Sequence, residues 1–283
     1  IENNGYGLST PTSEQFNCKN LSDRAHGYGM ESHIIDGNNI LEVYTKLKAI
    51  AADVRENPRP IMLEFKTFRV RGHEEASGTK YVPNELLQSW DLKDPLLNYS
   101  AFLKTQGVLT EEIEAASKAS IVKEIQDGLD IAFAEPTIAS TTTDELNDVF
   151  HRHEYKEVKE NKERVNLRLV DAISEGLKQS MQRHDNLVLM GQDIAEYGGV
   201  FKITDGFLEV FGKDRVRNTP ICESAIVSAA MGLSINGYKS MMEMQFSDFV
   251  TSGFNPIVNL LAKSNYRWNQ KADVVIRMPC GAG

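Results

Sequence analysis

The stretch 215–246, RVRNTPICESAIVSAAMGLSINGYKSMMEMQF, decides the fold. It predicts a strand over Arg215–Thr219, a helix over Ser224–Leu233 and a second strand over Lys239–Phe246, with Pro220 between the first strand and the helix. This order indicates a mostly parallel sheet with helices on both faces, which is an α/β fold. In such sheets ligands bind at the carboxyl ends of the strands, so functional residues are expected in the loops that follow strands.

The same alternation continues through the rest of the C-terminal half. Apolar runs at Leu187–Met190 and Asp273–Met278 predict further strands. The predicted helices of this half are one that starts near Asn166, a short one at Phe207–Phe211 and one at Ser247–Lys263.

The N-terminal half begins at the end of a predicted strand, Ile1–Asn4, and also contains predicted strands and helices. Apolar residues at three- and four-residue steps predict a helix over Asn38–Arg55. The alternation in Pro60–Phe68 predicts a strand with one fully apolar face. Thr110–Phe133 is predicted to be a helix with Thr110 as its N-cap and a continuous apolar stripe.

We therefore predict two domains, 1–135 and 166–283, joined by a linker at 136–165. The linker is small and polar at its start and almost wholly charged over His151–Arg164. Both ends of the chain are abrupt, which indicates that each domain is incomplete.

The composition is ordinary for a globular protein, with 283 residues, 41% of them hydrophobic and 25% charged. The net charge of −9 argues against nucleic acid as the main partner and provides no basic face for anionic lipid. No apolar run is long enough to predict a membrane span. Three widely separated cysteines, Cys18, Cys222 and Cys280, favour a reduced compartment over a disulfide framework.

Two stretches of the N-terminal half carry polar residues at loop positions. Asn3–Ser9 contains an asparagine whose amide oxygen suits magnesium. Its glycines would let backbone N–H groups approach a phosphate. Taken alone, however, the stretch is only a turn signal. Phe68–Glu74 places Arg69, Arg71 and His73 after a strand. These side chains could bind a carboxylate or phosphate, and taken alone they are equally consistent with a solvated basic loop.

Two further stretches lie at strand-to-helix junctions of the C-terminal half. Arg217–Ser224 places Glu223 near a helix N-terminus, where the helix dipole favours a carboxylate, so taken alone Glu223 is an ordinary helix-start residue. Glu243–Phe249 occupies a similar junction, and taken alone it predicts an aromatic core pair.

Motifs of two kinds occur in order along the chain. The first half contains NNGY at 3–6, STPT at 9–12, RAHGYG at 24–29, IDGN at 35–38 and LEFKTFR at 63–69 with GH at 72–73. The second half contains GQDI at 191–194, GGVF at 198–201, NTPICE at 218–223 and QFSDF at 245–249. The chain thereby resembles the thiamine-diphosphate-dependent 2-oxo acid dehydrogenases, with alpha-like and beta-like parts fused. The details are most similar to the branched-chain, or 2-oxoisovalerate, enzymes.

The resemblance implies two thiamine-diphosphate-binding-type domains, of which the alpha-like one binds the diphosphate and Mg²⁺. The side chain of Asn4 and the carbonyl of Tyr6 would coordinate the metal. Leu8 would lie against the cofactor, Arg69 would order its loop, and His73 would lie beside the diphosphate and the reacting carbon.

In the beta-like domain the resemblance makes Glu223 the residue that hydrogen-bonds the aminopyrimidine ring and activates the cofactor. Ile221, Gln245 and Phe249 would line the ring. A carboxyl in this role works best in an apolar surround, which Ile221 and Phe249 could supply.

The implied reaction is oxidative decarboxylation of a 2-oxo acid in branched-chain amino acid catabolism, with the acyl group passed to the lipoyl group of a partner acyltransferase. His73 would assist that transfer. The family binds its cofactor between the two kinds of domain, usually across subunits, so a homo-oligomer in a multienzyme complex is expected. The expected location is the bacterial cytoplasm or the mitochondrial matrix, with no nucleic-acid or membrane partner.

The sequence departs from the family pattern at several places, two of which concern the metal and phosphate site. The Gly-Asp-Gly that supplies a further metal ligand does not occur in the chain, and Glu2 stands where branched-chain relatives often carry an arginine. Two alternatives therefore stay open, a pyruvate or acetoin dehydrogenase component and a non-catalytic structural fragment of such an enzyme.

Overall fold

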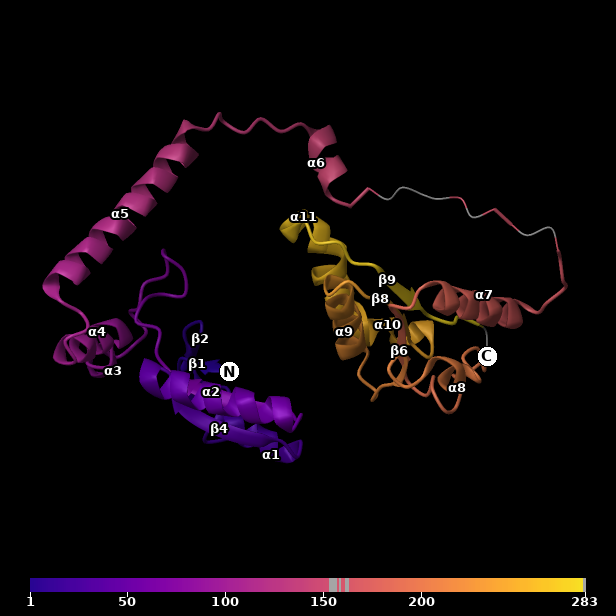
Figure 1. Cartoon of the computed structure of the whole chain (residues 1–283), viewed down its shortest axis with the longest axis horizontal. Coiled ribbons are helices and arrows are strands. Elements are labelled where there is room, and N and C mark those ends of the chain that lie inside the picture. Colours follow the sequence, from indigo (N-terminus) through magenta and orange to yellow (C-terminus); the bar gives the residue numbers. More distant parts are fainter. Residues whose placement is uncertain (153–156, 158, 161–162, 282–283) are drawn as a thin grey trace. The chain divides into compact units, whose positions relative to one another are not determined.

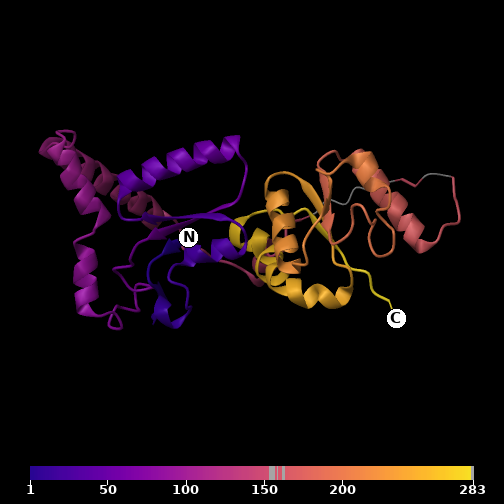
Figure 2. The ribbon, with the colours of Figure 1, turned by 90° about the horizontal axis from the view of Figure 1, so that it is seen from below.

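The computed structural model describes residues 1–152, 157, 159–160 and 163–281, and it divides into two compact units, Ile1–Pro136 and Thr137–Gly283 (Figures 1 and 2). Both units are α/β structures built on parallel sheets, as predicted. Part of the predicted linker 136–165 and the last two residues of the predicted 166–283 domain lie outside the described residues.

The N-terminal unit is organised by a three-stranded parallel sheet. Its strands are, in spatial order, β1 (Glu2–Asn3), β5 (Ile61–Lys66) and β4 (Glu31–Asp36). Helix α2 (Ile40–Glu56) connects β4 to β5 and lies along the sheet in Figure 1. The Asn39 side chain accepts the Glu42 N–H at 3.3 Å, which caps the helix and explains why it begins there.

Several elements of this unit are not predicted by the sequence pattern. Besides β4, they are β2 (Tyr6–Gly7), β3 (Thr10–Pro11), η1 (Thr12–Glu14), η2 (Leu21–Asp23), α1 (Arg24–Gly27), α3 (Asn84–Asp91) and α4 (Pro95–Thr105). The predicted helix α5 (Glu111–Ala134) is present, and Thr110 caps it by accepting the Ile113 N–H. Its apolar stripe is not buried, since Phe133 is 83% and Ile125 58% exposed.

The strand predicted at 60–68 is present as β5, but its apolar face is not the buried one. Ile61, Leu63 and Phe65 are only half-buried, whereas Glu64 on the opposite face is completely buried. The alternation of apolar and polar residues identifies the strand. It does not show which face other segments cover, because that depends on tertiary contacts.

The C-terminal unit contains a four-stranded parallel sheet. Its strands are, in spatial order, β7 (Val216–Asn218), β6 (Leu187–Gly191), β8 (Lys239–Glu243) and β9 (Val274–Arg277). Its helices are α6 (Thr142–Asp148), α7 (Leu169–Arg183), α8 (Phe207–Phe211), α9 (Glu223–Ile235), α10 (Val250–Asn259) and α11 (Ser264–Trp268), with single turns η3 (Ser247–Phe249) and η4 (Leu261–Lys263). Helix α6 lies inside the predicted linker 136–165.

Two apolar clusters pack on opposite faces of this sheet. Leu187 and Leu189 of β6 belong to one cluster, with residues of α7 and α8, while Val188 and Met190 belong to the other, with residues of α9 and α10. Every residue of β6 is therefore buried, which explains why it forms a continuous apolar run in the sequence.

The predicted strand 239–246 is shorter than expected, because β8 ends at Glu243. The predicted helix 247–263 is divided into η3, α10 and η4. Pro256 lies inside α10 and has no N–H for the carbonyl of Ser252, four residues earlier. Ser224 Oγ of α9 donates to that carbonyl at 2.6 Å, so contact with a neighbouring helix compensates for the proline.

Within the part of the chain that the structure describes, no helix combines the length and apolar composition needed to cross a membrane.

Candidate functional site

The loop that follows β1 is held by the side chains of its own asparagines. Asn3 Oδ1 accepts the Gly5 N–H at 3.1 Å, and Asn4 Oδ1 accepts the Tyr6 N–H at 3.0 Å. These are two successive Asx turns. Gly5 has φ +83°, a conformation that glycine adopts without a side-chain clash. The turns fix Asn4 and Tyr6, the predicted metal ligands, relative to each other.

Glu64 lies beneath this loop and is 0% exposed. Its carboxylate accepts hydrogen bonds from Lys66 Nζ at 2.6 Å, Asn3 Nδ2 at 2.7 Å and Ser22 N at 2.8 Å. Burial raises the pKa of Glu64, but these hydrogen bonds outweigh burial and lower the pKa to about 2. The sequence pattern does not single out Glu64; the available signal was a Glu and a Lys two positions apart on one face of a strand.

The Arg69 side chain contacts residues of the two loops that follow β1 and β5. Its Nη2 donates to the Leu8 carbonyl at 2.6 Å and to the Tyr81 hydroxyl at 3.0 Å, and its Nη1 lies 3.4 Å from His73 Nδ1. Leu8 has φ +58°, an uncommon conformation for a residue with a side chain. The structure therefore places three predicted site residues, Leu8, Arg69 and His73, in one cluster.

Aromatic packing joins the same two loops. The Tyr6 ring lies edge-on to Phe68 and Tyr81, with centroid distances of 6.1 and 5.8 Å. Phe68 in turn stacks on Trp90 at 5.4 Å. The Tyr6 side chain is thus used in packing, which leaves its backbone carbonyl as the group available to a ligand.

The oxygen atoms of this loop fit magnesium only in part. A pocket of about 370 Å³ is lined by residues that include Asn3, Asn4 and Tyr6. Magnesium requires six oxygen ligands and is commonly shared between one or two protein groups, water and phosphate. Among the described residues, no cluster of three or more His, Cys, Asp or Glu could hold a metal ion. Asn4 and Tyr6 therefore suit magnesium bound together with a diphosphate, and not magnesium bound by the protein alone.

In the C-terminal unit, Glu223 is the first residue of α9 and is 8% exposed. Its Oε1 accepts a hydrogen bond from Gln192 Nε2 at 2.9 Å. Gln192 directly follows β6 and Glu223 follows β7, so both side chains come from the carboxyl edge of the parallel sheet. Oε2 of Glu223 accepts no hydrogen bond from the described residues. The arrangement orients one carboxylate oxygen and leaves the other for a ligand.

The remaining predicted residues of this unit are partly assembled. Gln245 Nε2 lies 3.4 Å from Asp193 Oδ2, next to Gln192, and Phe249 packs edge-on against Phe246 at 6.0 Å. Ile221, however, is 83% exposed, so the expected apolar surround of Glu223 from Ile221 is wrong for this structure. The reason is that Ile221 belongs to the turn between β7 and α9 and not to the buried helix.

A buried ion pair lies at the same sheet edge and was also missed by the sequence analysis. Glu243, the last residue of β8, is 1% exposed, and its Oε2 accepts hydrogen bonds from Nε of Arg277, at 3.0 Å, and from Nη2. Its Oε1 has no hydrogen-bond partner in the described part of the chain. Glu243 lies opposite Gly191 in the strand register, so the pair helps hold the end of β6 from which Gln192 projects.

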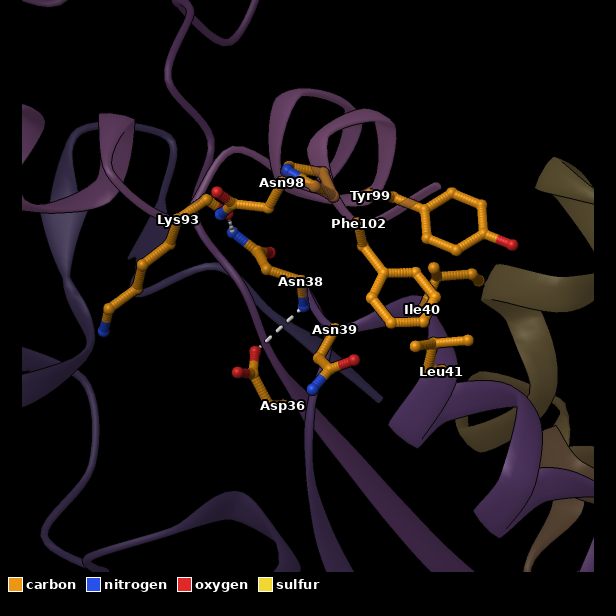
Figure 3. A pocket seen from close by; sticks show the side chains of 10 residues that line it. Asp36, Asn38, Asn39, Ile40, Leu41, Lys93, Asn98, Tyr99 and Phe102 are labelled. Carbon is orange, nitrogen blue, oxygen red and sulfur yellow. Dashed lines mark hydrogen bonds between the residues drawn. The ribbon is translucent and has the colours of Figure 1, made fainter. Parts of the chain in front are cut away.

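A second pocket of the N-terminal unit, of about 330 Å³, lies apart from these residues (Figure 3). It is formed by the end of β4, the start of α2 and helix α4. At the polar side of this pocket, Asn38 donates to Asp36 Oδ1 and to the Lys93 carbonyl. None of the predicted site residues lines it.

Comparison with protein families matches each unit to a different family. Residues 1–140 match the dehydrogenase E1 component, and residues 166–283 match the transketolase pyrimidine-binding domain.

Comparison with curated proteins finds relatives over part of the chain. The 2-oxoisovalerate dehydrogenase subunit beta of Bacillus subtilis is 40% identical over 116 residues, which is 40% of this chain and 36% of that protein. The pyruvate dehydrogenase E1 component subunit beta of Staphylococcus epidermidis, and that of Staphylococcus aureus, are 38% identical over 117 residues, or 41% of this chain and 36% of theirs. The chain therefore spans about a third of the length of these relatives.

Proposed function

We propose that the chain forms part of a thiamine-diphosphate-dependent 2-oxo acid dehydrogenase, because residues 1–140 match the dehydrogenase E1 component and residues 166–283 match the transketolase pyrimidine-binding domain. The proposed reaction is oxidative decarboxylation of a branched-chain 2-oxo acid of the 2-oxoisovalerate type, with transfer of the acyl group to a lipoylated acyltransferase. The similarity to a 2-oxoisovalerate dehydrogenase supports this substrate class.

The observation that carries the proposal is the buried pair Glu223–Gln192. The bound cofactor would supply the electron sink that amino acid side chains lack. Gln192 holds Oε1 of Glu223, so Oε2 can face the aminopyrimidine ring and exchange a proton with it.

The N-terminal unit would contribute the other half-site. Asn4 Oδ1 and the Tyr6 carbonyl would hold Mg²⁺ together with the diphosphate, and Leu8 would contact the cofactor. Arg69 would keep His73 in place for the acyl transfer. The two half-sites need not meet within one chain, so we also propose a homo-oligomer, with a bacterial cytoplasmic or mitochondrial matrix location.

Turnover of the full-length enzyme tests the role of Glu223. Glu223→Gln is expected to lower turnover by roughly 10²-fold or more, the usual scale for an acid–base group. Glu209→Gln, at an exposed position of helix α8, is the matched control and should leave turnover unchanged. Equal turnover in the two variants would remove Glu223 from the mechanism.

Calorimetric titration of the 283-residue chain with thiamine diphosphate and Mg²⁺ distinguishes an active half-site from a structural fragment. Saturable, magnesium-dependent binding supports the proposal. No binding at millimolar cofactor supports the non-catalytic fragment, for which the absent Gly-Asp-Gly is the motivating observation.

A pyruvate dehydrogenase component is the second candidate, because two of the relatives carry that name. Assay of the full-length enzyme with pyruvate and with 2-oxoisovalerate separates the two. A higher kcat/KM for pyruvate would overturn the branched-chain assignment.

A further inference from the structure

We propose that Glu64 is a positioning residue for the Asn3–Tyr6 loop: its buried carboxylate sets the orientation of the Asn3 side chain and, through it, the backbone that carries the two candidate metal ligands. The identity of the ligand rests on the proposed function. The geometry rests only on contacts within the N-terminal unit.

The burial of Glu64 requires a reason, because a carboxylate removed from water is destabilising unless its oxygens are hydrogen-bonded. Oε1 accepts from Asn3 Nδ2 and Lys66 Nζ, and Oε2 accepts from Ser22 N. Glu64 belongs to β5, the central strand of the sheet, as does Lys66. Asn3 comes from β1 and Ser22 from η2. One side chain thus ties three segments together directly behind the loop.

The chemistry of the carboxylate fixes which way the Asn3 amide points. An ionised carboxylate only accepts hydrogen bonds, so only the NH₂ group of Asn3 can face Glu64. Asn3 Oδ1 is then directed at the Gly5 N–H, 3.1 Å away. A reversed amide would place two oxygens in contact on one side and two donors on the other.

The path from Glu64 to the candidate ligands is therefore short and continuous. Glu64 orients Asn3, Asn3 holds the Gly5 amide, and Gly5 separates Asn4 from Tyr6. The Asn3 carbonyl also accepts the Thr67 N–H at 3.0 Å, which ties the start of the loop to the chain just beyond β5. Without the carboxylate, either amide orientation of Asn3 is allowed and the Gly5 turn is no longer specified.

Amide hydrogen exchange in the cofactor-free 283-residue chain tests the proposal. Glu64→Gln is expected to speed exchange at the Gly5 amide by about 10-fold, the change expected for one lost hydrogen bond. Glu31→Gln, which removes an exposed carboxylate from the neighbouring strand β4, is the matched control and should leave Gly5 unchanged. Unchanged Gly5 exchange in a folded Glu64→Gln variant would overturn the proposal.

A second variant separates positioning from general support of the fold. In the exchanged pair, Asn3→Asp with Glu64→Gln, a carboxylate at 3 can accept from both the amide at 64 and the Gly5 N–H. Slow Gly5 exchange should return in this pair. If Glu64→Gln alone does not fold, the exchanged pair carries the test, and fast Gly5 exchange in it would contradict the role.

Calorimetry on the same proteins keeps this proposal distinct from the proposed function. Glu64→Gln is expected to weaken magnesium-dependent binding of thiamine diphosphate by about 10-fold, in line with the exchange result. If the unaltered chain binds no cofactor, the proposed function fails for this chain while the exchange data still decide the role of Glu64. If binding and exchange are both unaltered by Glu64→Gln, the positioning role fails and the function stands.

Discussion

Replacing Glu64 with Gln should change how the stability of the N-terminal unit depends on pH. The pKa of Glu64 falls from an ordinary 4.5 to about 2 in the folded chain. A decrease of about 2.5, at about 1.4 kcal/mol for each pH unit, corresponds to about 3 kcal/mol of stability. Because the folded-state pKa is lowered, this contribution is complete above pH 4.5 and is lost as the pH falls towards 2.

Urea denaturation between pH 6 and pH 2 measures this contribution. The chain has two tryptophans, Trp90 in the N-terminal unit and Trp268 in the C-terminal unit, so a Trp268→Phe background makes fluorescence report on the unit that contains Glu64. Trp90 stacks on Phe68, close to the loop that follows β5, and its emission should respond to unfolding there.

The decisive quantity is the stability difference between the parent and Glu64→Gln. It should shrink by about 3 kcal/mol between pH 6 and pH 2, because the parent loses the carboxylate on protonation and the variant never has it. Lys66 is the charged group that faces Glu64, with its Nζ 2.6 Å from Oε1. A difference that stays constant with pH would refute the reasoning, since it would mean that the carboxylate charge contributes nothing to the folded state.

Three further variants test contacts in the C-terminal unit. Arg277→Met leaves Glu243 as an uncompensated buried charge and should lower the free energy of unfolding by about 3–5 kcal/mol in urea denaturation. Ser224→Ala removes the donor to the Ser252 carbonyl and should cost about 1 kcal/mol by the same measurement. Gly198→Ala should lower the melting temperature, with a loss of more than about 2 kcal/mol, because Gly198 has φ +79° and an added Cβ would lie 2.7 Å from a backbone atom.

Two of these variants have an internal control. Ser228→Ala removes a hydroxyl that bonds only within α9 and should have a smaller effect than Ser224→Ala. Gly237→Ala also has positive φ but open space around the added Cβ, so it isolates conformational strain from collision. Equal effects within either pair would contradict the contact-based explanation.

The helices and strands with a clear apolar pattern could be predicted from the sequence. β6 is an example, because burial on both faces requires an uninterrupted apolar run. β4 is as long as β5 but was not predicted, because its two apolar residues, Ile34 and Ile35, are adjacent and do not alternate with polar ones. The end of β8 was misplaced because apolar residues continue past Glu243, the last residue of β8 that is paired in register with β9.

The residues of the candidate site also fall into two groups, those that the sequence predicts and those that only the structure reveals. Sequence order alone identified Asn4, Tyr6, His73 and Glu223, because these residue types follow predicted strands in the order typical of one enzyme family. It could not identify the residues that hold them. Those roles remain predictions until the tests above are made.

The sequence by itself determined the two α/β halves and the residues that offer chemistry to a ligand, since both depend on local pattern and residue type. Only the tertiary structure decided that Glu64 is buried beneath the Asn3–Tyr6 loop, that Gln192 holds Glu223, and that Ile221 is left in solvent. The physical reason is that burial and hydrogen-bond partnership are set by segments distant in the chain. Glu64 and Asn3 are separated by 61 positions, and Glu223 and Gln192 by 31, so no local pattern reports their contact.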